Sequence, residues 1–565
     1  MSATPTTTDS PHARTALVLA SVAAVIWVSH YWLSRSFGLY EDDYWWPVQS
    51  MLLDWDGFLA TLRVMVQNLN QNMARPILDT LMFSLSMLGI RLGGIWGLYL
   101  VGYVILFLNG ALMYGLALKL TNRQSFAATA ALAFVLFPAD TSQAFIIHSF
   151  GLQTSLTFLL LALNLYARGY RWASYMVASA CLLTYEVAYP AFSGAPFLTE
   201  RWDRRLPRKA FKHFAIAGSI LGGVVLWRVL LGESRVASIE PLDTLRHALF
   251  NMVVGPFVVA KQWLARPADG LWRQSAEYPL LLTGTFVGSV LLLLGLTRGR
   301  QPSASDPERR RRIRDLALGS LVMLPLAYPL ALTVEATEVY GRASRVHLAA
   351  GIGAAVLVAG ALIWLYDVLR SRGKGLAGIL IIALVMTAAT ADGLTIQTDY
   401  RDAWQYQRAF WTDVARLCPD AGNNTVVLVD RTLIREPREI FMLGWSMVDV
   451  LTRMYAFPDR WELPPVSATL KWNWREQLRE GKPLRDCIDW KGMGTMFAKP
   501  YADAEYIFLD VVDGKLRRLT GEVELEGRRF HFKERTGHVL PHMPEGPLHG
   551  DLLLPPGEPP ADYTW

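Results

Sequence analysis

Three consecutive carboxylates, Glu41, Asp42 and Asp43, follow the first long apolar segment of the chain, residues 15–34. We call them the acidic cluster, and tyrosine and tryptophan residues flank them within residues 38–47. Charged groups at the mouth of a membrane helix cost solvation energy, so they are seldom retained for packing alone. The cluster predicts a site that holds a polar, ring-shaped substrate and removes a proton from it. The alternative is a solvated helix end within an interfacial aromatic belt.

The composition is that of a polytopic membrane protein. Hydrophobic residues make up 52% of the 565 residues and charged residues only 18%, and apolar runs long enough to cross a bilayer recur over residues 1–395. The first run has no small-x-small cleavage site behind it, which predicts a retained helix and not a signal peptide. The net charge of +6 arises in short loops between apolar runs. It therefore predicts membrane orientation and excludes nucleic acid as a partner.

Three basic loops set the predicted orientation, because arginine and lysine concentrate in cytoplasmic loops. They are residues 201–212, 298–314 and 370–374. Placing all three in the cytoplasm gives about eleven spans, with a cytoplasmic N-terminus and an external C-terminus. The predicted spans are residues 15–34, 96–118, 125–139, 144–167, 172–184, 186–200, 213–232, 278–297, 316–333, 348–369 and 375–394.

The loops on the external side carry most of the polar groups that could do chemistry. They are the loop with the acidic cluster, the segment 233–277 and the short loop 334–347. Within the segment 233–277, an amphipathic stretch at 245–266 suits lying in the membrane interface. We therefore expect a composite site on one face of the membrane.

The chain is predicted to form two domains, an apolar part at 1–395 and an external domain at 396–565. Strand-like runs at 425–430 and 505–510 alternate in the second part with helical patterns and Pro/Gly-rich turns. This pattern is typical of a small soluble α/β domain. Two of the three cysteines, Cys418 and Cys487, fall in that domain, where an oxidising compartment would allow them to pair.

No nucleotide-binding motif is present: the sequence has no Walker lysine and no GxGxxG ahead of a helix, and it also lacks CxxC and HExxH. Nucleotide-linked donors are supplied in the cytoplasm, whereas the acidic cluster is predicted to face outward. A sugar donor would then be lipid-linked and presented from within the bilayer.

These features resemble the polytopic family C (GT-C) glycosyltransferases, which use polyprenyl- or dolichyl-phosphate sugars. Four elements over about residues 1–400 carry the resemblance: Asp42-Asp43 after the first span, Arg75-Pro76 later in the same loop, Glu186 before Pro190 in residues 182–190, and the arginine-containing segment 340–347. Some of these elements are similar to those of transmembrane O-mannosyltransferases. Tyr185 replaces the lysine that often precedes the glutamate there, so the resemblance implies the general chemistry and not the acceptor.

Inverting transfer from a sugar phospholipid needs a general base for the acceptor hydroxyl group, and we assign this role to Asp42 or Asp43. The second carboxylate can orient the acceptor or help to bind a divalent cation, Mg²⁺ or Mn²⁺. We expect Glu41 to be a solvated neighbour. Arg342 and Arg345 share one face of a helical turn and suit the donor phosphate, with headgroup anchoring as the alternative.

Five other polar residues are further candidates. His347 can add a donor for the phosphate or lie in the interface, and Arg75 can contact the phosphate or tie down the first loop through a carboxylate. Glu186 is costly between apolar spans unless it pairs with an arginine. His148 can contact the sugar or have a structural role, and Lys261 can meet a lipid phosphate or snorkel.

The sequence thus predicts an integral membrane glycosyltransferase in a bacterial inner membrane, with the C-terminal domain in the periplasm. Its partners would be the bilayer, a polyprenyl-phosphate-sugar donor and a glycan, glycolipid or protein acceptor. A transporter or flippase of a lipid-linked saccharide precursor is the alternative, and it would be expected to carry charges along the midplane of several spans. A non-catalytic membrane scaffold would leave the acidic cluster without a role.

Overall fold

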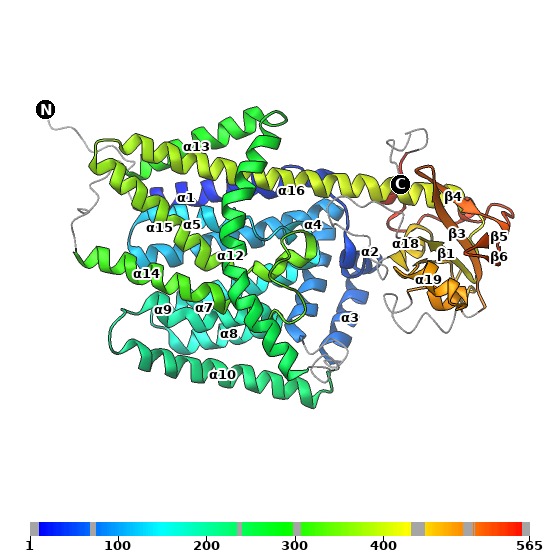
Figure 1. Cartoon of the computed structure of the whole chain (residues 1–565), viewed down its shortest axis with the longest axis horizontal. Coiled ribbons are helices and arrows are strands. Elements are labelled where there is room, and N and C mark those ends of the chain that lie inside the picture. Colours follow the sequence, from blue (N-terminus) through cyan, green and yellow to red (C-terminus); the bar gives the residue numbers. More distant parts are fainter. Residues whose placement is uncertain are drawn as a thin grey trace. The chain divides into compact units, whose positions relative to one another are not determined.

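The computed structural model describes residues 11–67, 75–233, 240–297, 307–430, 447–489, 501 and 503–555. The chain divides into two compact units, the first made of Met1–Arg35 with Trp55–Thr398 and the second of Ser36–Asp54 with Asp399–Trp565. Among the described residues, the first unit is helical and all strands belong to the second (Figure 1). The acidic cluster therefore belongs to the second unit, although it precedes most of the helices in the sequence.

Eight of the described helical segments are long and apolar enough to cross a membrane, which confirms a multi-pass membrane protein. They are His12–Ser36, which contains α1 (Pro11–Ile26), α4 (Pro76–Thr121), Ile146–Ala167, which contains α7 (Thr154–Ala167), α10 (Leu206–Leu230), Leu242–Gln274 within α12 (Pro241–Gln274), α13 (Pro279–Thr297), α15 (Ala350–Ser371) and α16 (Gly375–Leu417).

The other predicted spans fall on shorter or more charged helices. They are α5 (Gln124–Val135), α8 (Arg171–Thr184), the 3₁₀ segment η6 (Glu186–Gly194) with α9 (Ala195–Thr199), and α14 (Pro307–Leu326). Helix α5 is buried along almost its whole length, so its mostly apolar and uncharged sequence fits the inside of the bundle. The number of crossings and their sidedness stay predictions, and part of the second basic loop, including Arg298 and Arg300, lies outside the described residues.

One long helix is interrupted at two glycines, and another contains two internal prolines. Helix α4 is interrupted at Gly93 and Gly94, where Gly94 has φ 61° and ψ −142°, so an amphipathic half and an apolar half meet at the glycines. Helix α12 contains Pro256 and Pro267 and runs across the direction of α10, α14 and α15 in Figure 1. Its length qualifies it as a span, whereas that direction agrees with the interfacial helix expected at 245–266.

The second unit contains a four-stranded sheet in the order β2-β1-β3-β4. Strands β1 (Thr425–Val429), β2 (Val466–Thr469) and β3 (Glu505–Val512) are parallel, β4 (Lys515–Leu519) is antiparallel to β3, and β5 (Gly521–Leu525) pairs with β6 (Arg528–Phe532). Both strand-like runs of the sequence are confirmed as β1 and β3, and β1 is buried throughout, as expected of a central parallel strand. Cys418 and Cys487 are free, buried thiols.

Candidate functional site

The acidic cluster is held by aromatic contacts within the second unit. The Tyr40 hydroxyl group donates to the Tyr400 carbonyl oxygen at 2.7 Å and accepts from the Gly38 N–H at 3.2 Å. Gly38 lies against Trp404 so closely that an added Cβ would be 1.8 Å from the indole ring. The Tyr44 hydroxyl group donates to Gln407 Oε1 at 2.7 Å. The loop after the first helix is therefore fixed to the C-terminal part of α16.

The three carboxylates occupy different environments on a 3₁₀ turn, η3 (Glu41–Tyr44). Asp43 is 1% exposed, and its Oδ2 accepts a hydrogen bond from the Tyr40 N–H at 3.2 Å as an N-terminal cap. Asp42 is half-buried, so its carboxylate is the more accessible of the aspartate pair. The expectation that Glu41 is solvated is wrong, since Glu41 is 3% exposed. Its φ of 48° lies in the left-handed region, which costs a non-glycine residue on the order of 1 kcal/mol.

A second constellation, in the first unit, forms at the 3₁₀ segment η7 (Gly341–His347), which we call the arginine turn. Residues three apart eclipse each other in a 3₁₀ helix, so Arg342 and Arg345 share a face, as their spacing predicted. Both arginines are half-buried, and Arg345 Nη1 lies 3.3 Å from His148 Nε2. The arginine turn therefore presents two guanidinium groups next to a buried imidazole.

His347 is a structural member of the arginine turn. Its ring is fully buried, with Nε2 at 3.0 Å from the Glu338 carbonyl oxygen and Nδ1 at 2.8 Å from the Tyr328 hydroxyl group. Because Nε2 must donate to the carbonyl group, Nδ1 accepts from the tyrosine. Burial lowers the pKa of His347 to about 4, so the ring is neutral near pH 7. In this geometry both ring nitrogens are engaged within the protein, and neither is offered to a phosphate group.

The segment packed against the arginine turn contains polar atoms without partners. Asp140 Oδ1 accepts from the Ser142 N–H at 2.9 Å, and the Ser344 Oγ of the arginine turn lies 3.4 Å from it. The other acceptor of this group, Asp140 Oδ2, is buried and makes no hydrogen bond with any described residue, and the same holds for Gln143 Oε1 and His148 Nδ1. An unsatisfied buried polar atom costs about 1–3 kcal/mol. Three such atoms in the segment packed against the arginine turn make this region a candidate for binding a polar ligand.

Arg266 of α12 fastens the two loops of this constellation together. Its Nη1 donates to the Pro138 carbonyl oxygen and its Nη2 to the Val339 carbonyl oxygen, each at 2.6 Å, and its guanidinium group lies over the Tyr340 ring. Sequence reasoning missed Asp140, Gln143 and Arg266. The one signal for Asp140 was an isolated carboxylate directly after an apolar helix, whereas Gln143 and Arg266 carry no motif.

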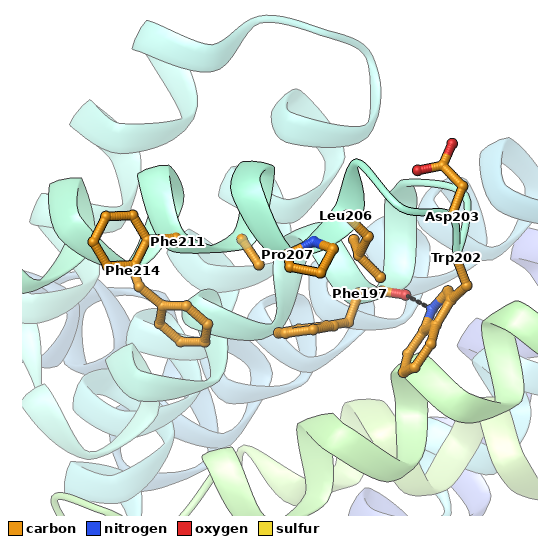
Figure 2. A pocket seen from close by; sticks show the side chains of 8 residues that line it. Phe197, Trp202, Asp203, Leu206, Pro207, Phe211 and Phe214 are labelled. Carbon is orange, nitrogen blue, oxygen red and sulfur yellow. Dashed lines mark hydrogen bonds between the residues drawn. The ribbon is translucent and has the colours of Figure 1, made fainter.

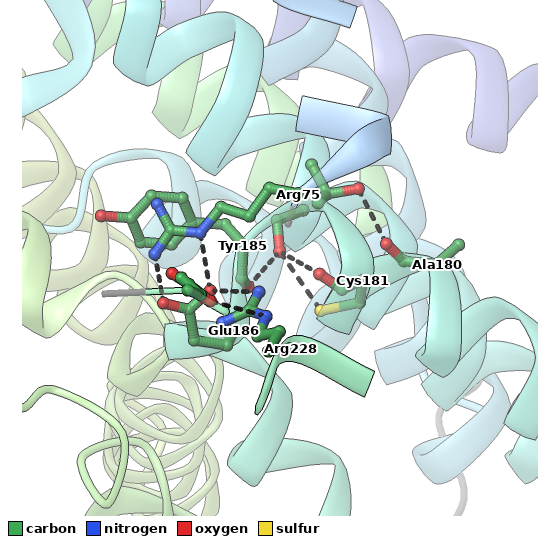
Figure 3. Close-up of polar contacts among 9 residues, drawn as sticks. Arg75, Ala180, Cys181, Tyr185, Glu186 and Arg228 are labelled. Carbon is green, nitrogen blue, oxygen red and sulfur yellow. Dashed lines mark hydrogen bonds and ion pairs between the residues drawn. The ribbon is translucent and has the colours of Figure 1, made fainter. Parts of the chain in front are cut away.

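Arg75 and Glu186, two sequence-predicted candidates, form a buried ion pair with each other (Figure 3). Arg75 Nε donates to Glu186 Oε2 at 2.9 Å and Nη2 pairs with Oε1, while Arg228 Nη2 donates to Glu186 Oε2 at 3.2 Å. Arg75 also lies over the Tyr185 ring, with 4.5 Å to its centroid. The alternatives in which Arg75 ties down its loop and Glu186 pairs with an arginine are the ones seen in this geometry. Arg228 was not foreseen.

The remaining candidates are placed as follows. Lys261 is exposed on α12. No group of three or more His, Cys, Asp or Glu side chains able to hold a metal occurs in the described parts of the chain, so the divalent-cation role of Asp42 and Asp43 stays a prediction.

No known protein-family model matches this chain, and no curated protein is similar to it at a significant level.

Proposed function

We propose that this protein is an integral membrane glycosyltransferase of the GT-C type, which transfers a sugar from a polyprenyl-phosphate donor to a glycan, glycolipid or protein acceptor. The observation that carries the proposal is the arginine turn with Arg342 and Arg345, together with the segment that contacts it through His148 and Asp140. In that segment, Asp140 Oδ2, Gln143 Oε1 and His148 Nδ1 are buried without a hydrogen-bond partner among the described residues. Arginine suits a phosphate group, and the carboxylate and amide oxygens suit the hydroxyl groups of a sugar. A sugar phosphate combines both kinds of group.

The arginines would act on the leaving group. As the glycosidic bond to the phosphate breaks, negative charge grows on the phosphate oxygens, and fixed guanidinium groups stabilise that charge more in the transition state than in the ground state. Arg345 is positioned by its contact with His148, and the arginine turn is fastened through Ser344. Because these contacts already hold the arginines in position, the side chains would need to move less during the reaction.

The acidic cluster would supply the general base. Asp42 is the better candidate because it is half-buried, whereas Asp43 is fully buried and caps its own turn. Asp42 would take the proton of the acceptor hydroxyl group as that oxygen attacks the anomeric carbon. Asp43 would fix the position of Asp42, and a Mg²⁺ or Mn²⁺ ion bound by the pair remains part of the proposal.

The proposal includes the finer topology: about eleven crossings, a cytoplasmic N-terminus and a periplasmic C-terminus in a bacterial inner membrane. The reaction would then take place at the periplasmic face. The α/β domain would contribute to the choice of acceptor there.

A transporter or flippase of a lipid-linked saccharide is the second candidate, and one observation favours it. Asp392 lies within α16, inside a predicted span, and is only 7% exposed. Carboxylates buried in spans are frequent in transporters.

The deciding experiment presents the purified protein with a panel of radiolabelled polyprenyl-phosphate sugars and acceptor lipids. The enzyme proposal expects one donor to be consumed, with release of polyprenyl phosphate, and expects Arg345→Ala to abolish most of this activity. Arg372→Ala, an exposed arginine of another loop, serves as the matched control. Movement of an intact donor across proteoliposomes, without cleavage of any donor, would support the transporter instead.

A further inference from the structure

An apolar groove lies where α9 meets α10, remote in sequence from both candidate sites (Figure 2). Its volume is about 510 Å³, and its walls are mainly aromatic and aliphatic. The lining residues include Phe197, Trp202, Leu206, Phe211 and Phe214. Phe211 is 76% exposed and Phe214 38% exposed, so the groove opens on the outer surface of the first unit.

The corner that forms the groove is held in place by polar contacts behind the rings. The Trp202 indole Nε1–H donates to the Phe197 carbonyl oxygen at 3.0 Å, drawn as a dashed line in Figure 2. The Trp202 N–H donates to Asp315 Oδ2 of α14 at 3.3 Å. Asp203 points away from the rings in Figure 2 and accepts the Arg205 N–H at 2.8 Å. The groove is therefore a preformed feature of the fold.

The segment that forms the groove carries more basic than acidic residues. Residues 200–212 contain six basic and two acidic residues. Glu200 is neutralised by Arg171 at 2.5 Å and by Lys209 at 2.7 Å. The cations that make no ion pair with any described residue are Arg204, Arg205, Arg208 and Lys212, all of them exposed.

These cations lie at an unfavourable place for positive charge. Arg205 caps the N-terminus of α10, the end at which a helix dipole is positive and where anions are stabilised. On the helix, Pro207, Ala210, Phe211 and Phe214 follow the spacing of a single face, which is the groove face. Arg208 and Lys212, four residues apart, flank that face, so a ligand with an apolar part in the groove would bring an anionic part against them.

We propose that this groove binds an anionic glycerophospholipid, with one acyl chain along the aromatic wall and the headgroup phosphate against Arg204, Arg208 and Lys212. Helix α10 is a candidate membrane span that begins at Leu206, so the groove lies where a span meets its flanking basic loop. A lipid headgroup meets the acyl region at that level of a membrane. The site is separate from the proposed sugar-transfer chemistry and does not depend on it.

The test is native mass spectrometry of the full-length protein in detergent, titrated with dioleoyl phosphatidylglycerol or dioleoyl phosphatidylcholine. The first phosphatidylglycerol should bind at least about ten-fold more tightly than phosphatidylcholine, because each nearby cation adds about five-fold in affinity for an anionic lipid. The double variant Arg204→Gln/Arg208→Gln should lose at least about ten-fold for phosphatidylglycerol and little for phosphatidylcholine. Phe211→Ser should weaken both lipids, since it removes part of the apolar wall.

The matched control is Arg370→Gln/Arg372→Gln, which removes two exposed arginines from another basic loop. Equal affinity of the wild type for the two lipids would overturn the proposal, as would an equal loss in the control variant. The proposal would also be overturned if the wild type were a dimer and Phe211→Ser were a monomer with unchanged lipid binding. That result would assign the groove to contact with a second copy of the chain.

Discussion

Two arginine clusters of the first unit use the same side chain in opposite ways. In the Arg75–Glu186–Arg228 cluster, Glu186 lies between two buried guanidinium groups and Glu233 lies 3.7 Å from Arg228, so two carboxylates balance two arginines inside the protein. At the arginine turn, Arg342 and Arg345 are half-buried, and the segment packed against the turn contains buried atoms of Asp140, Gln143 and His148 that have no hydrogen-bond partner among the described residues. The unbonded atoms of the first cluster, Arg228 Nε and Glu233 Oε2, lie 3.7 Å from each other as an ion pair. The difference between the clusters is that the unbonded atoms beside the arginine turn form no ion pair with a described residue.

A hydroxyl group on a ligand would form hydrogen bonds with the polar atoms beside the arginine turn. Binding would then recover the free energy that these atoms cost when they have no hydrogen bond. In the Arg75 cluster, the two atoms without a hydrogen bond, Arg228 Nε and Glu233 Oε2, are instead ion-pair partners of each other. We therefore expect substitutions in the Arg75 cluster to change stability and substitutions at the arginine turn to change activity.

The largest effect is expected for the proposed general base. Asp42→Asn should lower the turnover number for sugar transfer by about 10²–10⁴, the range for loss of a general base, without loss of folded protein. Asp43→Asn keeps the shape of the capping side chain and should cost less turnover but more stability, because its carboxylate caps a buried turn. Turnover numbers and thermal midpoints of both variants check this. Near-normal turnover of both would remove the acidic cluster from the mechanism.

A large effect on stability is expected in the Arg75 cluster. Glu186→Gln removes the carboxylate of the buried Arg75 and leaves Arg228 only its 3.7 Å ion pair with Glu233, which should cost about 3–5 kcal/mol of folding free energy. Arg228→Met should cost less, because Arg75 keeps its two contacts with Glu186. Thermal unfolding in detergent measures both. If Glu186→Gln were as stable as the wild type but unable to bind donor, the cluster would be part of the site and the contrast would fail.

An acid-sensitive ion pair is expected in the second unit. Asp420 is 1% exposed and pairs with Arg518, whose Nη2 donates to Asp420 Oδ2 at 3.0 Å. Burial alone would raise the pKa of Asp420, but the hydrogen bonds from Arg518 and from the Thr536 N–H outweigh it and lower that pKa. A lowered pKa in the folded state stabilises above the usual aspartate pKa of about 4, and the contribution is lost as the pH falls below that value.

The opening of the second unit can be measured separately from that of the first, as the rate at which a pyridyl disulfide labels the buried thiols Cys418 and Cys487. Labelling should accelerate as the pH falls from about 5 to about 3, while Cys181 of the first unit stays protected. Asp420→Asn should be labelled faster than the wild type at pH 7 and should show a weaker pH dependence. An unchanged acid profile in that variant would assign the acid sensitivity to other groups.

A smaller effect is expected at the polar atoms beside the arginine turn. Gln143→Leu removes a buried amide with an unsatisfied oxygen, so stability should stay the same or rise by about 1 kcal/mol. Donor affinity should fall by about ten-fold, since one hydrogen bond to the sugar is lost. The two readouts are the thermal midpoint and the KM for the donor. A variant with lower stability and normal KM would show that Gln143 is structural, like Glu186.

The coarse fold could be predicted from the sequence, because a long apolar run can form only a few kinds of structure, namely a membrane span or a buried helix or strand. The spans around α10, α13 and α15 and the strands β1 and β3 were all found in this way. The stretch 245–266 was predicted to lie in the interface because of its mixed polarity, whereas α12, the helix that contains it, is long and apolar enough to be a candidate span. The interfacial placement stays a prediction. The span expected at 186–200 is instead the 3₁₀ segment η6 followed by the short helix α9, and Pro190 lies within η6.

The candidate site was predicted less completely, for physical reasons. The spacing of Arg342 and Arg345 gave their common face, because that relation is local. The partners of Asp140 and Arg266 depend on contacts between residues far apart in the sequence, such as Arg266 with Pro138. The burial of Glu41 follows from tertiary packing of a loop that looked like a solvated helix end. Neither relation leaves a periodic or spaced pattern in the sequence.

The most direct test of the central claim is the rate of sugar transfer by Arg345→Ala and Arg345→Lys at saturating donor. The account predicts a loss of about 10²-fold for alanine, in the range seen when a group that stabilises transition-state charge is removed. Lysine should recover only part of this loss, because it keeps the charge without the paired donor geometry. Full recovery by lysine, or normal transfer by the alanine variant, would contradict the claim that the arginine turn holds the donor phosphate.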